Sequence, residues 1–234
     1  MSLSRTAVPS AIAARCAVDR ARRLSASASG VALLALGAAL ALPAPARAQG
    51  DVGTLVQWVR ATGDNGGAAF AVVDKKGARV HVFDASGKER GSSPILLGLA
   101  RGDDSVPGIG ERPMAQIRPE ERTTPAGRFA SEPGRNLQGE DIVWVDYDAA
   151  VSMHRVRATN PAERRLERLA TPTIADNRIS YGCINVPAAF YDMHVKPLLG
   201  TRRGVVYVLP ETRSLAAMFG TRVAGAATAA TPAR

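Results

Sequence analysis

Arg178-Ile179-Ser180-Tyr181-Gly182-Cys183-Ile184-Asn185-Val186 is the stretch of this 234-residue chain with the most distinctive chemistry. A serine and a glycine precede the cysteine, and together they allow a tight turn. A glycine beside a cysteine also lets consecutive backbone N–H groups point toward one spot. Such a turn suits a nucleophilic thiol that has hydrogen-bond donors for an oxyanion close by. Cys183 is therefore a candidate nucleophile.

The six residues Ser180-Tyr181-Gly182-Cys183-Ile184-Asn185 resemble the signature of the L,D-transpeptidases, the YkuD-type family of enzymes that cross-link peptidoglycan. Five of the six positions match, and Tyr181 stands where the family has its second histidine. Thr124-Pro125-Ala126-Gly127-Arg128-Phe129 is similar to a Thr-Pro-x-Gly-x-Phe segment of the same family, which we interpret as shaping the cleft. The resemblance extends over roughly residues 70–209.

A histidine precedes the cysteine at the place where this family has its catalytic base. His154 lies late on the predicted strand 150–156 and shares a face with Ser152. A thiol at its free pKa is mostly protonated near neutral pH, so an adjacent base must raise the thiolate fraction. The resemblance implies that Cys183 is the nucleophile and His154 the base.

Neighbouring residues receive supporting roles from the same resemblance. The backbone N–H groups of Cys183, Gly182 or Tyr181 are expected to hold the oxyanion, and Ser180 is expected to shape the turn. The backbone carbonyl of Arg155 is expected to orient the imidazole by accepting an N–H bond. The remaining supporting candidates are Asn185 and Arg178.

The resemblance also implies a reaction and its partners. The thiolate attacks the carbonyl between a diamino acid at position three of a stem peptide and D-Ala at position four. D-Ala leaves, a thioester remains, and the amine of another stem's diamino acid resolves it into a 3→3 cross-link. Resolution by water would make the chain an L,D-carboxypeptidase. The expected partners are a tetrapeptide donor and a diamino-acid amine acceptor, with no cofactor and with the chain as a monomer.

Several alternatives remain open. Cys183 is a small buried structural residue in one of them, because free cysteine often packs as an apolar side chain. His194 is a rival base, whereas His81 fits a solvated strand position. An envelope-binding module without activity is a further alternative, and Tyr181 is its main support.

Two other cysteine-enzyme classes fit less well. In amidases of the NlpC/P60 type the cysteine precedes the histidine, and here the order is reversed. Sortases place histidine first, but their Thr-Leu-x-Thr pattern before the cysteine is absent from this chain.

The N-terminal region predicts export to the periplasm or cell envelope. Residues 1–48 contribute +5 to the net charge of +9, which leaves +4 for the remainder and does not match a nucleic-acid-binding profile. Arg15, Arg20, Arg22 and Arg23 precede an apolar run at 31–42, and Ala-Arg-Ala at 46–48 fits a cleavage site. We expect a cleaved signal peptide rather than a short anchor, so that the membrane is met only during export. Cys16 is then removed, and Cys183 has no partner for a disulfide.

The remaining chain predicts a mainly β domain with a few short helices, arranged as a sandwich-like mixed sheet. We expect an N-terminal helix and linker at 49–67, the catalytic domain at 68–212 and a low-complexity tail at 213–234. Strands are predicted at 69–74, 79–84, 94–98, 142–147, 150–156 and 204–209, from apolar or alternating runs between turn residues. No metal-ligand spacing is present in the sequence.

Two segments border the predicted site. Residues 101–122 are a long loop whose Arg101, Arg112, Arg118 and Arg122 either meet acidic peptide groups or are solvated, and we expect them to be solvated. A helix is predicted from Asn160 as N-cap to 170, with Pro161 at its first position, Glu163 closing a capping box, and Leu166 and Leu169 as an apolar stripe. This helix lengthens the interval between His154 and Cys183, either as a roof over the cleft or because another histidine is the base.

Overall fold

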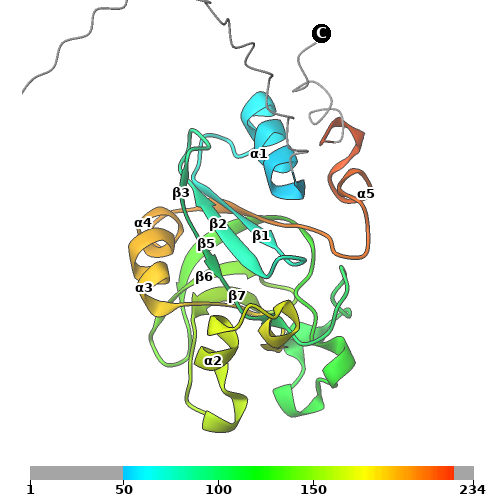
Figure 1. Cartoon of the computed structure of the whole chain (residues 1–234), viewed down its shortest axis with the longest axis vertical. Helices are drawn as coiled ribbons and strands as arrows, with labels where there is room; N and C mark the ends of the chain where they lie inside the picture. The colour runs from blue at the N-terminus through cyan, green and yellow to red at the C-terminus, as the bar shows by residue number, and fades with distance from the viewer. Residues whose placement is uncertain (1–49, 224–234) are drawn as a thin grey trace, which may run out of the picture. The chain divides into compact units, whose positions relative to one another are not determined.

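Eight strands form one mixed sheet in the computed structural model, which describes residues 50–223. Their order across the sheet is β3-β2-β1-β10-β5-β6-β7-β9 (Figure 1). The β1–β10 and β7–β9 pairs are parallel, and the other neighbours are antiparallel. A separate parallel pair joins β4 to β8. The strands span Phe70–Asp74 (β1), Arg79–Phe83 (β2), Glu89–Pro94 (β3), Leu97–Gly98 (β4), Gly127–Arg135 (β5), Asp141–Asp146 (β6), Val151–Arg155 (β7), Arg178–Ser180 (β8), Ile184–Val186 (β9) and Gly204–Val208 (β10).

The helices are short and lie around this sheet (Figure 1). They span Asp51–Thr62 (α1), Arg165–Ala170 (α2), Ala188–Phe190 (α3), Lys196–Leu199 (α4) and Leu215–Phe219 (α5), with a π turn at Tyr191–Val195 between α3 and α4. The predicted mainly β class with short helices is confirmed. Within residues 50–223 there is no helix whose length and apolar character would let it cross a membrane.

Successive residues of the strands point into two different apolar layers, as the pleat of a strand requires. On β1, Phe70 and Val72 pack in a layer with α1 and α5, whereas Ala71 and Val73 pack in a second layer on the other face. All four side chains are fully buried. Both faces of this central strand are therefore covered, which explains why its sequence is continuously apolar.

The sheet curls so that strands distant in its order share one core. Val80 on β2 packs in the same buried cluster as Val143 on β6 and Met153 on β7. Leu96, just after the edge strand β3, exchanges two backbone hydrogen bonds of 2.9 Å with Asn185 on the opposite edge strand β9. This bridge joins the two edges and holds the start of β9 in place.

The third strand differs from the prediction. We expected it at 94–98, where the sequence is apolar. Only the short β4 at Leu97–Gly98 forms there, and β3 covers Glu89–Pro94, which is mostly polar. An edge strand needs no apolar residues on its outer side, and charged side chains there discourage pairing with other chains. Ile95, Leu96 and Leu97 are fully buried because the chain turns inward at this point, not because they extend the hairpin.

The predicted helix at 160–170 is divided into two parts. A 3₁₀ turn covers Pro161–Glu163, with the Asn160 side chain accepting the N–H of Ala162 at 3.1 Å. Arg164 then adopts the left-handed conformation at φ 50°, and α2 begins only at Arg165. Leu166 is 59% exposed, so the expected apolar stripe does not form.

The structure describes only part of the predicted terminal segments. The predicted signal peptide at 1–48 lies outside the described residues. Within the predicted tail at 213–234, α5 begins after Ser214, whose hydroxyl accepts the N–H of Ala217, and Leu215 and Val223 are buried in the layer with α1. This part of the tail therefore contributes to the core.

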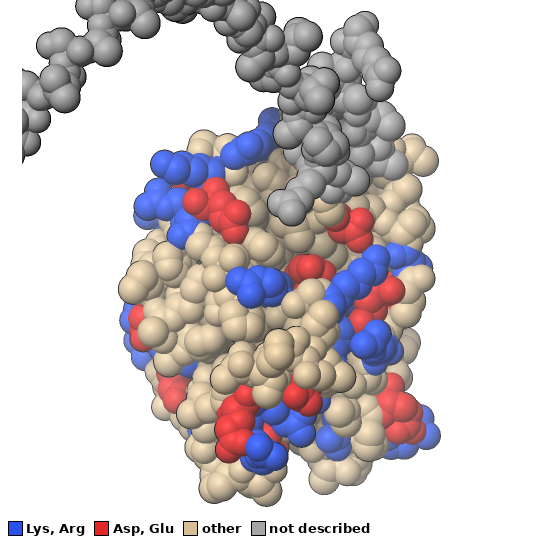
Figure 2. Space-filling model, in the orientation of Figure 1, with Lys and Arg blue, Asp and Glu red and all other residues tan. Residues whose placement is uncertain are grey.

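The loop at 101–122 contains three 3₁₀ turns and is organised around a carboxylate. Glu121 accepts bonds from the guanidinium groups of Arg112 and Arg118 and from the backbone N–H of Arg118. These two arginines are therefore paired within the loop. On the face drawn in Figure 2, basic and acidic side chains are interspersed rather than gathered by sign.

A buried group of charges ties this loop to the sheet and to the segment after β10. The Nζ of Lys75 lies 2.9 Å from Asp103 and 3.8 Å from Glu211, and Arg178 lies 2.6 Å from Glu211. Asp103 also accepts the backbone N–H groups of Glu211, Thr212 and Arg213. Buried charges are tolerated only when they are paired and hydrogen-bonded in this way.

We expect Asp103 to make stability depend on pH. Burial alone would raise the pKa of its carboxyl, but hydrogen bonds from the Thr212 hydroxyl, from Lys75 and from backbone N–H groups outweigh it and hold the pKa well below its usual range. A pKa lowered by folding stabilises the fold above the unfolded-state value of about 3.9, and this stabilisation is lost as the pH falls below it. Asp103→Asn should therefore lower the free energy of unfolding at pH 7, and the difference from the parent should shrink below about pH 4.

Urea unfolding at pH 7, 5 and 3 measures this effect. Asp104→Asn is the matched control, because Asp104 is 80% exposed and should change the curve little. A constant difference between Asp103→Asn and the parent at all three pH values would contradict the prediction.

Candidate active site

The cysteine lies in a turn that only glycine can complete. Gly182 has φ +130°, and a Cβ there would lie 2.9 Å from the carbonyl oxygen of Thr123. The Ser180 hydroxyl accepts the N–H of Gly182 at 3.1 Å and donates to the carbonyl of Cys183 at 2.6 Å. This serine closes the turn and presents Cys183 at the start of β9.

Thr124 anchors this turn to the rest of the sheet. Its fully buried hydroxyl donates to the carbonyl of Gly182 at 2.8 Å and accepts the N–H of Gly98 at 2.9 Å. The Thr-Pro-x-Gly segment therefore has a structural role at the cysteine turn, in line with its interpretation from the sequence.

Strand register brings His154 close to Cys183. β7 and β9 are parallel neighbours, with His154 opposite Asn185 and Met153 opposite Ile184. Since Met153 and Ile184 face the core, His154 and Asn185 point to the outer face. Ser152 lies on this face as well, and its Oγ is 3.7 Å from the Sγ of Cys183. The Sγ is also 3.7 Å from the carbonyl oxygen of Ala150.

The orientation of the imidazole is fixed by a backbone group. The Nδ1 of His154 lies 2.8 Å from the carbonyl oxygen of Arg155, so Nδ1 is the donor and Nε2 is left for the Cys183 thiol. This is the bond that the sequence analysis expected from Arg155. The half-buried His154 and the partly exposed Cys183 thus form a pair in one cleft, each close enough to shift the pKa of the other.

Each member of this pair favours the charged form of the other. Burial raises the pKa of the Cys183 thiol, but the hydrogen bond and positive charge of His154 outweigh burial, and the pKa lies below its ordinary value. Burial lowers the pKa of His154, but the bond to Cys183 and its charge outweigh burial and raise the pKa. Both shifts have the sign expected for a thiolate beside an imidazolium, the arrangement that activates a cysteine for nucleophilic attack.

A second set of hydrogen bonds, which the sequence did not predict, braces the cysteine turn through Asn185 and Arg165. The Nδ2 of the buried Asn185 donates to the carbonyl of Cys183 at 3.1 Å. Its Oδ1 accepts a hydrogen bond of 2.6 Å from the guanidinium of Arg165. Arg165 in turn forms an ion pair with Glu163. Both residues belong to the divided helix, and Arg165 was missed because nothing in its local sequence distinguishes it from the other arginines of this segment.

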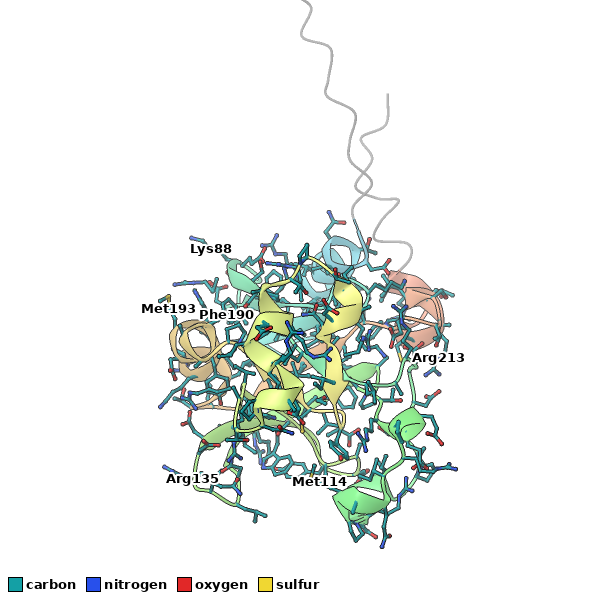
Figure 3. The ribbon with its side chains drawn as sticks, turned by 60° about the horizontal axis from the view of Figure 1, so that its bottom comes forward. Lys88, Met114, Arg135, Phe190, Met193 and Arg213 are labelled. Atoms are coloured by element: carbon teal, nitrogen blue, oxygen red, sulfur yellow. The ribbon has the colours of Figure 1, made fainter. Side chains whose placement is uncertain are left out.

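These side chains line an open cleft of about 400 Å³. Met114 from the loop, labelled in Figure 3, lies at the rim and is 61% exposed. The divided helix also lines the cleft, through Asn160, Glu163 and Arg165, as its interpretation as a roof over the cleft requires. The residues that line the cleft are Met114, His154, Arg157, Thr159, Asn160, Glu163, Arg165, Ser180, Tyr181, Cys183 and Asn185.

The candidate oxyanion donors are not equivalent. The N–H of Gly182 is already bonded to the Ser180 hydroxyl. Of the three candidate groups, the N–H groups of Cys183 and Tyr181 therefore remain to bind an oxyanion. Tyr181 lines the cleft, and its ring lies under the guanidinium of Arg122, whose Cζ is 3.8 Å from the ring centroid. Arg122 thus supports Tyr181 by a cation–π contact rather than being solvated.

Two supporting candidates lie away from the cleft. Arg178 is buried and bonds to Glu211 and to the carbonyl of Lys75, so its role is in the buried charge group. The side chain of Arg155 pairs with Asp141 and Asp192, and only its backbone carbonyl serves the site.

The other two histidines do not reach Cys183. The ring of His194 lies tilted against that of Phe190, with centroids 4.7 Å apart, and Figure 3 shows Phe190 and Met193 well apart from Met114 at the rim of the cleft. His81 pairs with Glu89 at 2.9 Å on the hairpin of β2 and β3. Of the three histidines, His154 is the one that lines the cleft together with Cys183. Among residues 50–223, no cluster of three or more His, Cys, Asp or Glu side chains could hold a metal ion.

Comparison with known proteins gives structural similarity alone. No protein-family model matches the chain, and no curated protein matches it. It is similar to the helical cell shape determining protein Pgp2 from Campylobacter jejuni, with 13% identity and a TM-score of 0.43 over 63% of this chain and 49% of that one. It is also similar to an L,D-transpeptidase from Mycobacterium smegmatis, with 15% identity and a TM-score of 0.35 over 60% of this chain and 58% of that one.

A further similarity is to the catalytic domain of the E. faecium L,D-transpeptidase, with 18% identity and a TM-score of 0.31 over 60% of this chain and 96% of that domain. The chain thus spans about half to three fifths of the first two structures. At these identities and scores the similarity carries no argument about activity, which must come from the site itself.

We expect His154 to control the titration of Cys183. In the parent, alkylation by iodoacetamide should reach half its maximal rate below pH 9.0, the ordinary value for a thiol. In His154→Ala the burial that raises the thiol pKa remains while the partner that lowers it is gone, so the midpoint should move to higher pH. His194→Ala is the matched control and should keep the parent midpoint. Coincident midpoints in His154→Ala and the parent would contradict the pairing.

We expect the Thr124 hydroxyl to be needed for the turn. Thr124→Val leaves the buried N–H of Gly98 and the carbonyl of Gly182 without this partner, which should lower the free energy of unfolding by about 2–5 kcal/mol. Thr124→Ser keeps the hydroxyl and should cost only about 1 kcal/mol for the lost methyl group. Urea unfolding measures both, and equal stability of the two variants would refute this role.

Proposed function

We propose that this chain is an exported cysteine acyltransferase of the L,D-transpeptidase type that acts on peptidoglycan stem peptides. The observation that carries the proposal is that Cys183 and His154 line one cleft, with the Nδ1 of His154 held by a backbone carbonyl so that Nε2 is left to exchange a proton with the thiol. The Ser-x-Gly-Cys-x-Asn turn and the cleft beside it support the same conclusion. Export to the periplasm or envelope is inferred from the sequence of residues 1–48 alone.

In the first half-reaction the Cys183 thiolate attacks the carbonyl carbon that joins the diamino acid to D-Ala. The negative charge moves to the carbonyl oxygen, where the backbone N–H groups of Cys183 and Tyr181 are the proposed donors. The C–N bond then breaks, and His154 Nε2 delivers its proton to the departing nitrogen, so that D-Ala leaves as a neutral amine. A thioester on Cys183 remains.

In the second half-reaction the amine of another diamino acid attacks the thioester carbon. Neutral His154 takes the proton of that amine, the C–S bond breaks, and the Cys183 thiolate is regenerated beside the imidazolium. The open cleft is the proposed route by which this second peptide reaches Cys183. Attack by water instead would yield a shortened stem peptide and a carboxypeptidase outcome.

Tyr181 does not prevent this chemistry if the position contributes only its backbone N–H. Its side chain is engaged with Arg122 and not with the Cys183–His154 pair. Tyr181→His should therefore leave acylation of Cys183 in place.

Acylation of Cys183 is the direct test. Incubation of the protein with a disaccharide-tetrapeptide or a carbapenem should add one acyl group, seen by intact mass, and Cys183→Ala should show none. His154→Ala should slow acylation by about 10²–10⁴-fold, the usual contribution of general acid–base assistance. His194→Ala should react at the parent rate.

The products separate the remaining alternatives. An amine-linked product with a diamino-acid acceptor supports the transpeptidase, whereas release of the tripeptide alone indicates a carboxypeptidase. If the folded parent is acylated by neither reagent, the proposed enzyme is wrong and a binding module is favoured.

A further inference from the structure

Two aromatic rings lie stacked on the outer face of the sheet, beside the strand that carries His154. Trp144 belongs to β6, and Tyr147 lies in the turn that leads to β7. Their ring centroids are 4.9 Å apart with an interplanar angle of 26°. Tyr147 is 56% exposed and Trp144 is half-buried. Exposed aromatic surface of this kind commonly marks a binding site.

The strand register places this aromatic pair close to the cysteine. Trp144 is directly opposite Ser152 in the antiparallel β6–β7 pair, so both side chains point to the same face. The Ser152 hydroxyl is 3.7 Å from the Sγ of Cys183. The turn that holds Tyr147 also contains Ala150, whose carbonyl oxygen is 3.7 Å from the same sulfur. β6 and β7 lie side by side in Figure 1, so a ligand on the aromatic pair is one strand away from β7, which carries His154.

A glycine on β5 leaves space for the indole ring of Trp144. Gly134 on β5 lies under Trp144, and a Cβ at that position would be 2.5 Å from both Cδ1 and Nε1 of the ring. Any larger residue would lift the indole from the backbone of β5. The absence of a side chain therefore lets Trp144 lie close to the sheet with Tyr147 stacked against it, forming an aromatic platform of Trp144 and Tyr147.

The spacing between the platform and Cys183 fits a particular part of the proposed substrate. Neighbouring strands are about 4.8 Å apart, so the two steps from β9 to β6 cover about 10 Å. Three extended residues span about 10–11 Å, which is the length of stem peptide between its attachment to the sugar and the carbonyl of residue three. With that carbonyl at Cys183 and the peptide extended across the sheet toward β6, the sugar would lie over the platform.

We propose that the aromatic platform of Trp144 and Tyr147 binds a pyranose ring of the glycan to which the donor stem peptide is attached. The C–H face of a pyranose is flat and apolar, so it packs on an aromatic face, while its hydroxyl and amide groups stay in water. This inference rests on the proposed function, because it assigns the substrate of that site as a glycan-linked peptide rather than a free one.

The first experiment compares two donors that differ only in the sugar. Acylation of Cys183 in the full chain is followed by intact mass with a disaccharide-tetrapeptide and with the free tetrapeptide. The parent should prefer the sugar-linked donor by about threefold to tenfold, the range of one aromatic contact. Tyr147→Ala should remove that preference without changing the rate with the free tetrapeptide, and Tyr147→Phe should keep it because the ring is retained.

The second experiment detects the sugar without any reaction. The chain has two tryptophans, so Trp58→Phe leaves Trp144 as the one fluorescent reporter. Titration with the peptide-free disaccharide should change its emission in a saturable way, and Tyr147→Ala should weaken this binding by a similar factor. Because no acylation is involved, this titration tests the platform even if the proposed enzyme activity fails.

The proposal is overturned if the parent shows no donor preference and the disaccharide leaves Trp144 emission unchanged. It is also overturned if emission changes with protein concentration rather than with sugar, since the platform would then be a contact between copies of the chain. A preference that survives in Tyr147→Ala would place sugar recognition elsewhere.

Discussion

The parallel pairing of β7 with β9 is the interaction on which the site depends. It sets His154 and Asn185 side by side and brings Cys183 next to Ser152. β9 is only three residues long, so the pairing needs external support. That support comes from the bridge between Leu96 and Asn185 and from the Thr124 hydroxyl at the turn. The geometry of the proposed site is thus a consequence of how the curled sheet closes upon itself.

The same closure explains why polar atoms crowd the start of β9. The carbonyl of Gly182 is bonded by Thr124, and the carbonyl of Cys183 by both Ser180 and Asn185. Such bonds remove the freedom of a short turn and leave the thiol in one place. Arg165 extends the brace into the divided helix, so this segment does more than cover the cleft.

The sequence was sufficient for the features that local patterns encode. The cysteine turn, the order of His154 before Cys183, α1 and the β6–β7 pair all follow from residue type and spacing. β3 was misplaced because an edge strand can be polar, and the helix at 160–170 was misjudged because the left-handed Arg164 has no sequence signal. The positions of Arg165 and Arg178 were not predictable, since each depends on partners about 20 or more residues away.

The charge state of His154 tests the central claim most directly. Ring ¹⁵N chemical shifts of the three histidines can be followed across pH in the parent and in Cys183→Ala, with His81 and His194 as internal references. If Cys183 and His154 form a thiolate–imidazolium pair, His154 should remain protonated to higher pH in the parent than in Cys183→Ala, while Nδ1 stays protonated in both. Identical titration of His154 in the two proteins would contradict the account.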